Sequence, residues 1–336
     1  MFPQADEHWC EVREFLRTRL QPWEHLIAPN DFLDYFPGVF PPVHAEQVPA
    51  RRVRYTVLHK GLEQRPDDPN ALPARRRRWL RRHAQVALEN AVFQVWRTPG
   101  PPTVGRIPTL PDGREGRTAI LVTTRERPGH LRRTLASLLP TGLEILVVDD
   151  GSGDACRQIY DSMAQEWAGR LRVLRLPANR GLPAALTIGL GELLADPEVG
   201  WISVFQDDCE LRDADAMDTL ARLQHARTRP LLSGMVHPLH PAQGMARIDG
   251  HPVQLQYACN GPHLHAHRSY WQAVLPVPTP YLGAPKRDRG RPGEGSGADW
   301  WISSWSPASA PKTGRHVVAV PGLAATFDAP GESTWA

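Results

Sequence analysis

The sequence predicts an α/β protein with a mostly parallel β-sheet flanked by helices, preceded by a small α/β domain. Between residues 118 and 211, four short apolar runs that end in turn residues alternate with stretches of helical periodicity. Strands that alternate with helices pair in parallel and are joined by right-handed crossovers. The chain has 336 residues, enough for two domains, and its 41% apolar and 22% charged residues are typical of a soluble globular protein.

The first 98 residues are expected to form the small α/β domain. Trp9–Leu20 has the periodicity of an amphipathic helix, and residues 31–35 and 77–89 are expected to add helices. A few parallel strands are predicted at residues 25–28, 53–58 and 91–96. Residues 99–116 are rich in Pro and Gly and are expected to be a linker.

The densest run of charge is Arg75–Arg82, which contains six arginines. A basic run with an embedded tryptophan could bind a polyanion such as nucleic acid, or an anionic membrane surface. Because the formal net charge of the chain is only +3, we favour a solvated helix face with Trp79 and Leu80 buried.

The four apolar runs of the next part are expected to be buried strands, at residues 118–124, 143–148, 171–176 and 201–205. Pro128 and Pro183 suit the first turns of helices after the first and third strands, and a further helix is predicted after Asp154. In an open α/β sheet, ligands bind outside the carboxyl ends of the strands. The polar residues at those ends are Arg125, Glu126, Asp149, Asp150, Asn179, Arg180, Asp207 and Asp208.

These elements resemble the nucleotide-sugar-binding half of a GT-A glycosyltransferase and are most similar to glycosyltransferase family 2. The resemblance is carried by Thr124-Arg-Glu-Arg-Pro128, Asp149-Asp-Gly-Ser152, Asn179-Arg-Gly181 and Gln206-Asp-Asp208, the last in place of an Asp-x-Asp element. It covers roughly residues 118–326. It implies a Rossmann-like GT-A domain over 117–328, with a donor half at 117–212 and an acceptor half at 213–328.

The resemblance implies a donor site at the strand ends. One of Asp149 and Asp150 would accept a hydrogen bond from the donor base; the alternative is that this stretch only makes a turn and caps the next helix with Ser152 or Asp154. A guanidinium could stack on the base or bind phosphate oxygens in a fork. The residues expected to bind the donor are Thr124, Arg125, Glu126, Asp149, Asp150, Asn179, Arg180, Gln206 and Asp207.

Asp208 is the expected metal ligand. A divalent cation, Mn²⁺ or Mg²⁺, would bridge the two phosphates of the leaving group and neutralise charge as the sugar bond breaks. Both cations prefer oxygen ligands. Gln206 departs from the family pattern, in which an acid is usual, and an amide binds a cation weakly. The metal would therefore have few ligands from the protein.

The acceptor half has a looser pattern. A helix is predicted over 213–227, and strands are predicted at 231–236, 253–257 and 316–320, with a hairpin turn at Asp249-Gly250. In the family, an Asn-Gly element similar to Asn260-Gly261 lies under the sugar and precedes a short helix, here Tyr270–Val274. Relatives often place a metal-binding His in the tail; here Asp328 or water would take its place, since His316 is a poor candidate.

His263, His265 and His267 alternate, so they would share one face of a strand, and this suggests a metal site. We favour instead a mix of sugar contacts and partly exposed histidines near a cleft. The reason is that no Cys or acid accompanies them at ligand spacing.

The catalytic base is expected after a flexible loop. Residues 281–297 are rich in Gly, Lys and Arg, which suggests a basic lid over the donor. The family carries an acid pair and then an aromatic at the position of Ala298-Asp-Trp300, and the second acid is the base. The resemblance therefore implies Asp299 as the base and Trp300 as a sugar or acceptor contact, with Ala298 replacing the first acid. The alternative is that Asp299 caps a helix.

The function expected from these features is metal-dependent, inverting transfer of a sugar from a nucleoside diphosphate, with uridine as the expected nucleoside, to an acceptor hydroxyl. A glycan, a protein or a small molecule could supply that hydroxyl. The alternatives are the same transfer onto a hydroxymethylated base in DNA, a non-catalytic nucleotide-sugar-binding protein and a nucleotidyltransferase.

The location expected from the sequence is the cytoplasm. No apolar run approaches the length of about 20 residues that spans a membrane, and the N-terminus lacks the basic start and apolar core of a signal peptide. The four cysteines have no CxxC spacing, which favours reduced thiols over a metal cluster or a disulfide framework.

Overall fold

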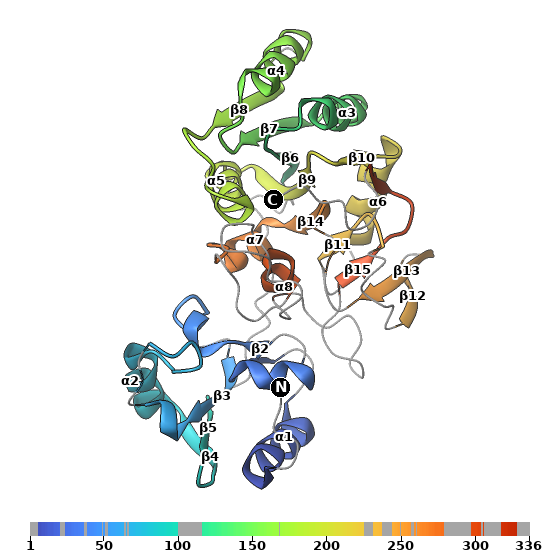
Figure 1. Cartoon of the computed structure of the whole chain (residues 1–336). Helices are drawn as coiled ribbons and strands as arrows, with labels where there is room; N and C mark the ends of the chain where they lie inside the picture. Colours follow the sequence, from blue (N-terminus) through green and yellow to red (C-terminus); the bar gives the residue numbers. More distant parts are fainter. Residues whose placement is uncertain are drawn as a thin grey trace.

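The computed structural model describes residues 6–20, 24–36, 39–48, 50, 53–63, 65, 67–99, 116–167, 169–224, 231–236, 244–248, 250–256, 259, 261–278, 297–303, 305 and 317–327. Within these residues it contains a five-stranded sheet in the N-terminal part and a nine-stranded and a two-stranded sheet in the remainder. Helices lie against both faces of the large sheet (Figure 1). The predicted α/β class is confirmed.

The N-terminal sheet is mixed, with strand order β2-β1-β3-β5-β4. Pairs β1–β2 and β1–β3 are parallel, whereas β3–β5 and β4–β5 are antiparallel, so the prediction of parallel strands holds for only part of it. Its strands are β1 His25–Ile27, β2 Val39–Phe40, β3 Val53–His59, β4 Gln85–Glu89 and β5 Phe93–Arg97.

The helices of this part are α1 Glu7–Arg19, α2 Ala74–His83 and the short 3-10 helices η1 Asn30–Asp34, η2 Pro42–His44 and η4 Lys60–Leu62. Helix α1 buries Val12 and Leu16, as its periodicity predicts. The predicted helix over 77–89 is wrong in its second half, which is strand β4. A turn at Asn90 explains this: its side-chain oxygen accepts hydrogen bonds from the backbone N–H groups of Val92 and Phe93, and so returns the chain as a hairpin.

The donor half contributes four adjacent strands in the order β8-β7-β6-β9, and all are parallel. They are β6 Arg117–Thr124, β7 Glu144–Asp149, β8 Leu171–Arg175 and β9 Val199–Gln206. The helices between them are α3 Pro128–Leu138, with the 3-10 turn η5 Leu139–Thr141, α4 Asp154–Glu166 and α5 Leu182–Leu194. All four predicted strands and all three predicted helices are present.

The acceptor half extends the same sheet beyond β9, in the order β12-β13-β15-β11-β14. Only β11–β15 is parallel among these added pairs. The strands are β11 Leu232–Ser233, β12 Gly244–Ile248, β13 His251–Gln256, β14 His263–His267 and β15 Val317–Ala319; β10 Cys209–Leu211 pairs separately with β16 Ala324–Thr326. The helices are α6 Asp215–Gln224, α7 Arg268–Val274 and α8 Ala298–Ser303.

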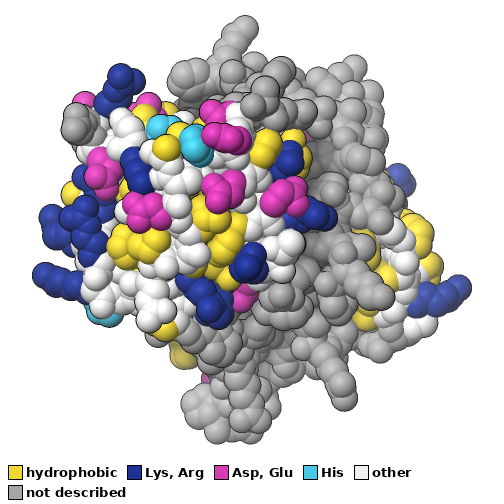
Figure 2. All heavy atoms as spheres, turned by 90° about the horizontal axis from the view of Figure 1, so that it is seen from below, with side chains coloured by type: hydrophobic (Ala, Val, Ile, Leu, Met, Phe, Trp, Pro, Cys, Tyr) yellow, Lys and Arg dark blue, Asp and Glu magenta, His cyan; other side chains and the backbone are white. Residues whose placement is uncertain are grey.

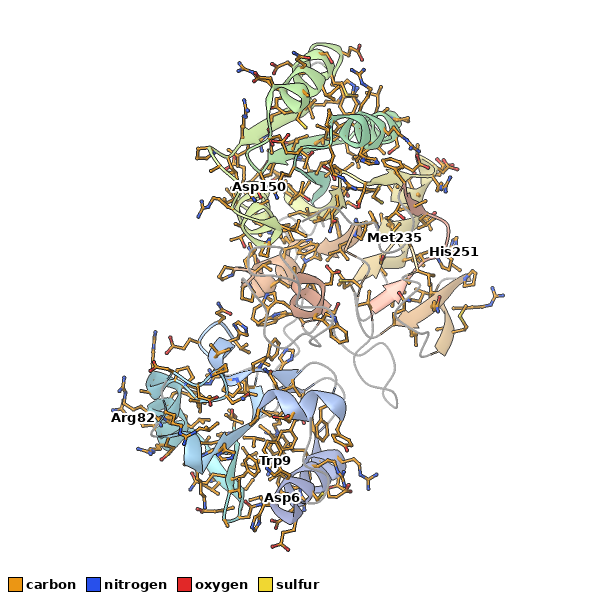
Figure 3. All side chains as sticks on the ribbon, viewed as in Figure 1. Asp6, Trp9, Arg82, Asp150, Met235 and His251 are labelled. Atoms are coloured by element: carbon orange, nitrogen blue, oxygen red, sulfur yellow. The ribbon has the colours of Figure 1, made fainter. Side chains whose placement is uncertain are left out.

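Alternate side chains of the central strands enter two hydrophobic cores. On β6, Leu121 joins the core that contains residues of α5, α7 and α8, whereas Val122 joins the core that contains residues of α3, α4 and α6. A third core, around Phe32, belongs to the N-terminal part alone, and Trp9 packs against it (Figure 3). The first core also takes in N-terminal residues such as Phe40 and Leu80, so the two parts of the chain are packed together.

All four cysteines are free thiols, and Cys156, Cys209 and Cys259 are buried. Among the residues described, no helix is both long and apolar enough to cross a membrane.

Candidate functional site

The polar residues at the strand ends surround the point where the strand order reverses. Strand β6 lies between β7 and β9, and the chain leaves it to build the sheet first on one side and then on the other. Such a switch point leaves a crevice at the carboxyl ends of the strands, where ligands bind. Thr124 pairs with Asp149 across β6–β7, and Thr123 pairs with Gln206 across β6–β9. Register therefore brings the ends of these strands together.

Asp207 is a fully buried carboxylate that ties β9 to the turn after β6. Its Oδ2 accepts hydrogen bonds from the Thr124 hydroxyl (2.8 Å) and the Arg125 backbone N–H (3.2 Å). Its backbone carbonyl accepts from the Thr134 hydroxyl of α3. Burial raises the pKa of Asp207 to about 6, against the lowering effect of the Thr124 hydrogen bond. Three of the residues expected to bind the donor are thus linked to one another.

Arg127 bridges the two adjacent carboxylates. Its Nη1 lies 3.3 Å from Oδ1 of Asp207 and 3.3 Å from Oδ2 of Asp208, and its side chain is 9% exposed. Sequence reasoning assigned no role to this arginine, although it stands in the Thr-x-x-Arg-Pro turn. The sequence did contain a signal for it. Arg127 directly precedes Pro128, a residue suited to the first turn of a helix, so its position at the start of α3 could have been predicted.

The arrangement of Arg127, Asp207 and Asp208 bears on whether a divalent cation fits here. Among the described residues, no group of three or more His, Cys, Asp or Glu side chains could hold a metal ion. The two carboxylates nevertheless share one cationic group, and Asp208 is only 5% exposed. A position that holds a guanidinium between carboxylate oxygens suits a cation with oxygen ligands. The residues therefore fit a metal that takes few ligands from the protein.

Asp149 makes internal hydrogen bonds at the end of β7. Its Oδ1 accepts from the Ser152 backbone N–H (2.9 Å), and its Oδ2 accepts from the Tyr160 hydroxyl (3.1 Å) and lies 3.6 Å from Arg175 Nε. Burial, and next the charge of Asp149, raise the pKa of Tyr160 to about 12.

Asp150 holds the Asn179-Arg-Gly181 turn. Its two carboxylate oxygens accept hydrogen bonds from the backbone N–H groups of Arg180 (2.7 Å) and Gly181 (2.8 Å). Asn179 closes the same turn by accepting from the Gly181 N–H at 3.0 Å. Gly181 has φ of +83°, which favours glycine, and α5 begins directly after it. Asp150 lies in the donor half (Figure 3), fully buried, whereas Asn179 and Arg180 are exposed.

The alternative in which Ser152 or Asp154 caps α4 does not hold. The N-cap residue is Gly153, and the helix start has no side-chain capping bond. Glu126 takes that place instead: its carboxylate accepts from the Gly153 N–H (3.0 Å), while its own N–H donates to the Ser152 hydroxyl (2.9 Å). Glu126 has φ of +54°, which is uncommon for a residue other than glycine. These bonds hold the turn after β6 against the start of α4.

The acceptor half brings a further carboxylate to this edge. Strand β14 runs antiparallel to β9, and the Gln206 N–H donates to the carbonyl of Pro262 at 2.9 Å. The preceding residue, Gly261, is covered by Asp299: a Cβ added to Gly261 would lie 2.6 Å from Asp299 Oδ1. Asp299 therefore lies against Gly261, the residue directly before Pro262, whose carbonyl is bonded to the last residue of β9.

Asp299 stands in the first turn of the six-residue helix α8, and its own carbonyl accepts a hydrogen bond from the Ser303 hydroxyl (2.5 Å). The same hydroxyl accepts from the Cys259 N–H (2.8 Å), so α8 is bonded to the chain just before Gly261. Trp300 is half-buried and packs against the first core.

The three alternating histidines share strand β14, but they are buried, which contradicts the expectation of partly exposed side chains near a cleft. The Gly234 N–H donates to His263 Nδ1 (2.8 Å), so Nε2 carries the proton toward the Ser203 hydroxyl (3.1 Å). His265 stacks on Trp201, and His267 accepts from the Ser269 N–H to cap α7. The central position of β14 explains their burial, because strands flank it on both sides.

These histidines predict an acid-sensitive fold. Burial lowers the pKa of His265 to about 3, compared with about 6.5 in an unfolded chain. Between these two pH values the unfolded state therefore binds more protons than the folded state. The contribution of His265 to the free energy of unfolding is fully present above about pH 6.5 and is lost as the pH falls towards 3. Replacing His265→Phe should remove about 1.4 kcal/mol per pH unit from that slope. Urea unfolding of both proteins between pH 7.5 and 4.5 measures this, and equal slopes would refute it.

Several predicted features lie outside the described residues: Asn260, Asp249, His316, Asp328, most of the linker over 99–116 and nearly all of the lid over 281–297.

Residues 119–230 match the family model described as "Glycosyl transferase family 2". The match covers the donor half and ends six residues after α6. It confirms the resemblance inferred from the four motifs. No match was found among curated proteins.

Three solved structures are similar to this chain at low identity. They are a mannosyltransferase, PcManGT, from Pyrobaculum calidifontis in complex with GDP-Man and Mn²⁺ (14% identity, 62% of this chain and 55% of that chain covered, TM-score 0.42), S. aureus TarS 1-349 (15%, 61% and 60%, 0.40) and GalNAc-T7 with UDP, GalNAc and Mn²⁺ (16%, 61% and 42%, 0.41). This chain thus spans less than two thirds of the length of each.

Proposed function

We propose that this glycosyltransferase moves a sugar from a nucleoside diphosphate, with uridine as the nucleoside, to an acceptor hydroxyl with inversion. The observation that supports the proposal is the pairing of β14 with β9: Gln206 is bonded to Pro262, and Asp299 lies against the preceding residue, Gly261. A carboxylate that can accept a proton and an acidic element suited to a diphosphate–cation complex then lie on one sheet edge. A transferase of this kind needs both.

Asp299 is the proposed base. As the acceptor oxygen attacks the anomeric carbon of the sugar, its proton passes to the carboxylate of Asp299, and the bond from that carbon to the diphosphate oxygen breaks. The nucleoside diphosphate leaves with the bonding electron pair. One displacement from the opposite face inverts the anomeric centre. Gly261 supports this role, because a side chain at this position would collide with the carboxylate of Asp299. Glycine leaves the space that the carboxylate occupies.

Asp208 is the proposed ligand of a Mn²⁺ or Mg²⁺ ion, with Arg127 beside it. When bound, the cation would neutralise the charge of the diphosphate. Asp207 has a positioning role in this proposal, because its Oδ2 accepts from the Thr124 hydroxyl and the Arg125 N–H and so fixes the turn over which the donor would lie. Gln206 is the last residue of β9 and is 8% exposed.

The base of the donor is proposed to lie over the ends of β7 and β8. Asp149 and Asp150 are both buried and both bonded to the protein, so we assign them to holding the Asn179 turn and the start of α4 in register. The exposed Asn179 and Arg180 and the half-buried Arg125 then present side chains to the donor.

Helix α2 bears on the acceptor. Arg75, Arg78, Arg81 and Arg82 are exposed, as a solvated face predicts, whereas Arg76 is buried and donates to the Val48 carbonyl. Seen from below, the surface shows Lys and Arg at the left margin and also at the lower centre and the right edge, with Asp and Glu between them (Figure 2). The exposed arginines favour including DNA with hydroxymethylated bases among the acceptors tested, beside glycans and small alcohols.

The test is a donor assay with Mn²⁺ and a set of nucleotide sugars, in which released nucleoside diphosphate and transferred sugar are both measured. The proposal expects release of the diphosphate from one donor, faster with the correct acceptor. Release of pyrophosphate from a sugar phosphate and a nucleoside triphosphate would instead identify a nucleotidyltransferase. Binding of donors without any turnover would identify a binding protein.

A further inference from the structure

We propose that the N-terminal part of the chain holds helix α8, and with it Asp299, in the position that transfer requires. The proposal rests on the proposed function of Asp299. It assigns a role to residues 6–99, which the family match does not include. The residues that would do this are positioning residues: they contact α8 or the residues next to it, and do not contact the reacting atoms.

The contact is a cluster of five rings, which we call the aromatic seam: His25, Phe40, His44, Trp301 and Trp305. Phe40 of β2 lies with its ring centroid 5.4 Å from that of Trp301 and 5.3 Å from that of Trp305. His25 of β1 lies 5.5 Å from Trp305, and His44 of η2 lies 5.9 Å from Trp301. The interplanar angles of 55–72° are those of tilted and edge-to-face pairs, an arrangement that aromatic rings prefer.

Trp301 is fully buried and is fixed on its other side as well. Its Nε1 donates to the carbonyl of Val274 at the end of α7 (2.7 Å), and the Tyr270 hydroxyl of α7 donates to the Ile302 carbonyl. Helix α8 is therefore held between α7 and the N-terminal sheet. Since Trp301 lies two residues after Asp299, a shift of its ring moves the turn that carries the carboxylate.

The aromatic seam belongs to a continuous core. Phe40, Ala45 and Val48 from the N-terminal part share one buried cluster with Trp301, Ile302 and Trp305 and with residues of α5 and α7. Exposure of Phe40 and Trp301 is 0%. An accessory module joined only by a linker would present a polar, solvated contact to the catalytic part. Here the contact is packed like a protein interior, so the N-terminal part supports the helix that carries Asp299.

The inference can be tested because the N-terminal part has a second core that does not touch α8. Phe32 is a fully buried phenylalanine of that separate core, packed on Trp9 and Phe93. Phe32→Ala is therefore a matched control for Phe40→Ala. Each removes a buried ring from the N-terminal part, but only Phe40→Ala removes a ring that contacts α8.

For Phe40→Ala we expect a fall of kcat of about 10- to 100-fold, because small displacements of a catalytic group are costly, while the donor Kd stays within about twofold. Phe40→Leu, which keeps most of the volume, should recover part of the loss and replaces the alanine variant if that does not fold. Phe32→Ala should lower Tm yet keep kcat at a temperature where it is folded. Equal kcat losses at Phe32 and Phe40, or none at Phe40, would overturn the proposal.

Amide hydrogen exchange gives a readout that does not depend on activity. Exchange at residues 298–303 should speed up in Phe40→Ala and stay unchanged in Phe32→Ala. Unchanged exchange there in Phe40→Ala would also overturn the proposal. If the wild-type protein transfers no sugar but α8 loosens as expected, the positional contact stands and the proposed function of Asp299 fails.

Discussion

Replacing Asp299→Asn should reduce sugar transfer by about 10²- to 10⁴-fold, the contribution of a general base, while donor affinity stays the same. The amide has the shape of the carboxylate and keeps the contact with Gly261. It cannot accept the proton of the acceptor hydroxyl. Steady-state transfer rates measure the loss, and isothermal titration with the nucleoside diphosphate and Mn²⁺ measures the donor affinity.

A matched control for this substitution is Asp196→Asn. Asp196 is a partly exposed acid at the far end of α5, paired with Arg117 on the surface. We expect its loss to leave kcat unchanged, because it is remote from the carboxyl ends of the strands. Normal turnover by Asp299→Asn, with Asp196→Asn equally active, would remove the base assignment while leaving the donor site in place.

Replacing Asp208→Ala should weaken donor binding in the presence of Mn²⁺ by about 100-fold, the equivalent of a few kcal/mol. Removing that carboxylate takes away the proposed ligand of the cation. Titration of the donor with and without Mn²⁺ separates the two effects: we expect the wild-type protein to gain affinity from the metal and Asp208→Ala to gain none. An unchanged donor affinity with Mn²⁺ would contradict the assignment.

Arg127→Gln tests the same site by removing the cationic group and keeping the two carboxylates. It removes the guanidinium that now lies 3.3 Å from both carboxylates and leaves Asp207 and Asp208 buried side by side. Without metal its Tm should fall, because two buried carboxylates lose their counter-charge. Added Mn²⁺ should then raise its Tm more than that of the wild type, since ligand binding stabilises the folded state. Equal increments would argue against a cation at Asp208.

Much of the donor half could be predicted because its signals are local. Each strand there is an apolar run that ends in turn residues, and Pro128 and Pro183 mark helix starts in the sequence itself. The N-terminal part was harder. Strand β2 is two residues long, and β4 follows α2 after a single residue, so the Asn90 turn and the pairing with β5 together decide its conformation. Pairing of this kind is tertiary and leaves little trace in periodicity.

The candidate site was predictable at its strand ends but not in its internal bonds. The convergence of Thr124 and Asp207 follows from strand register. The bridge from Arg127 and the cover of Gly261 by Asp299 depend on side-chain packing between distant segments. The burial of the histidines could not be foreseen either, because it depends on β14 being inserted between β11 and β9. A pattern of alternation does not say on how many sides a strand is covered.

The most direct test of the account is a crystal structure with UDP and Mn²⁺ bound. We predict density for the diphosphate at the edge formed by the ends of β6, β7 and β9, with the metal on Asp208 and the carboxylate of Asp299 facing the open end of the diphosphate. Nucleotide density elsewhere, with Asp208 still held by Arg127 and no ion beside it, would contradict the account.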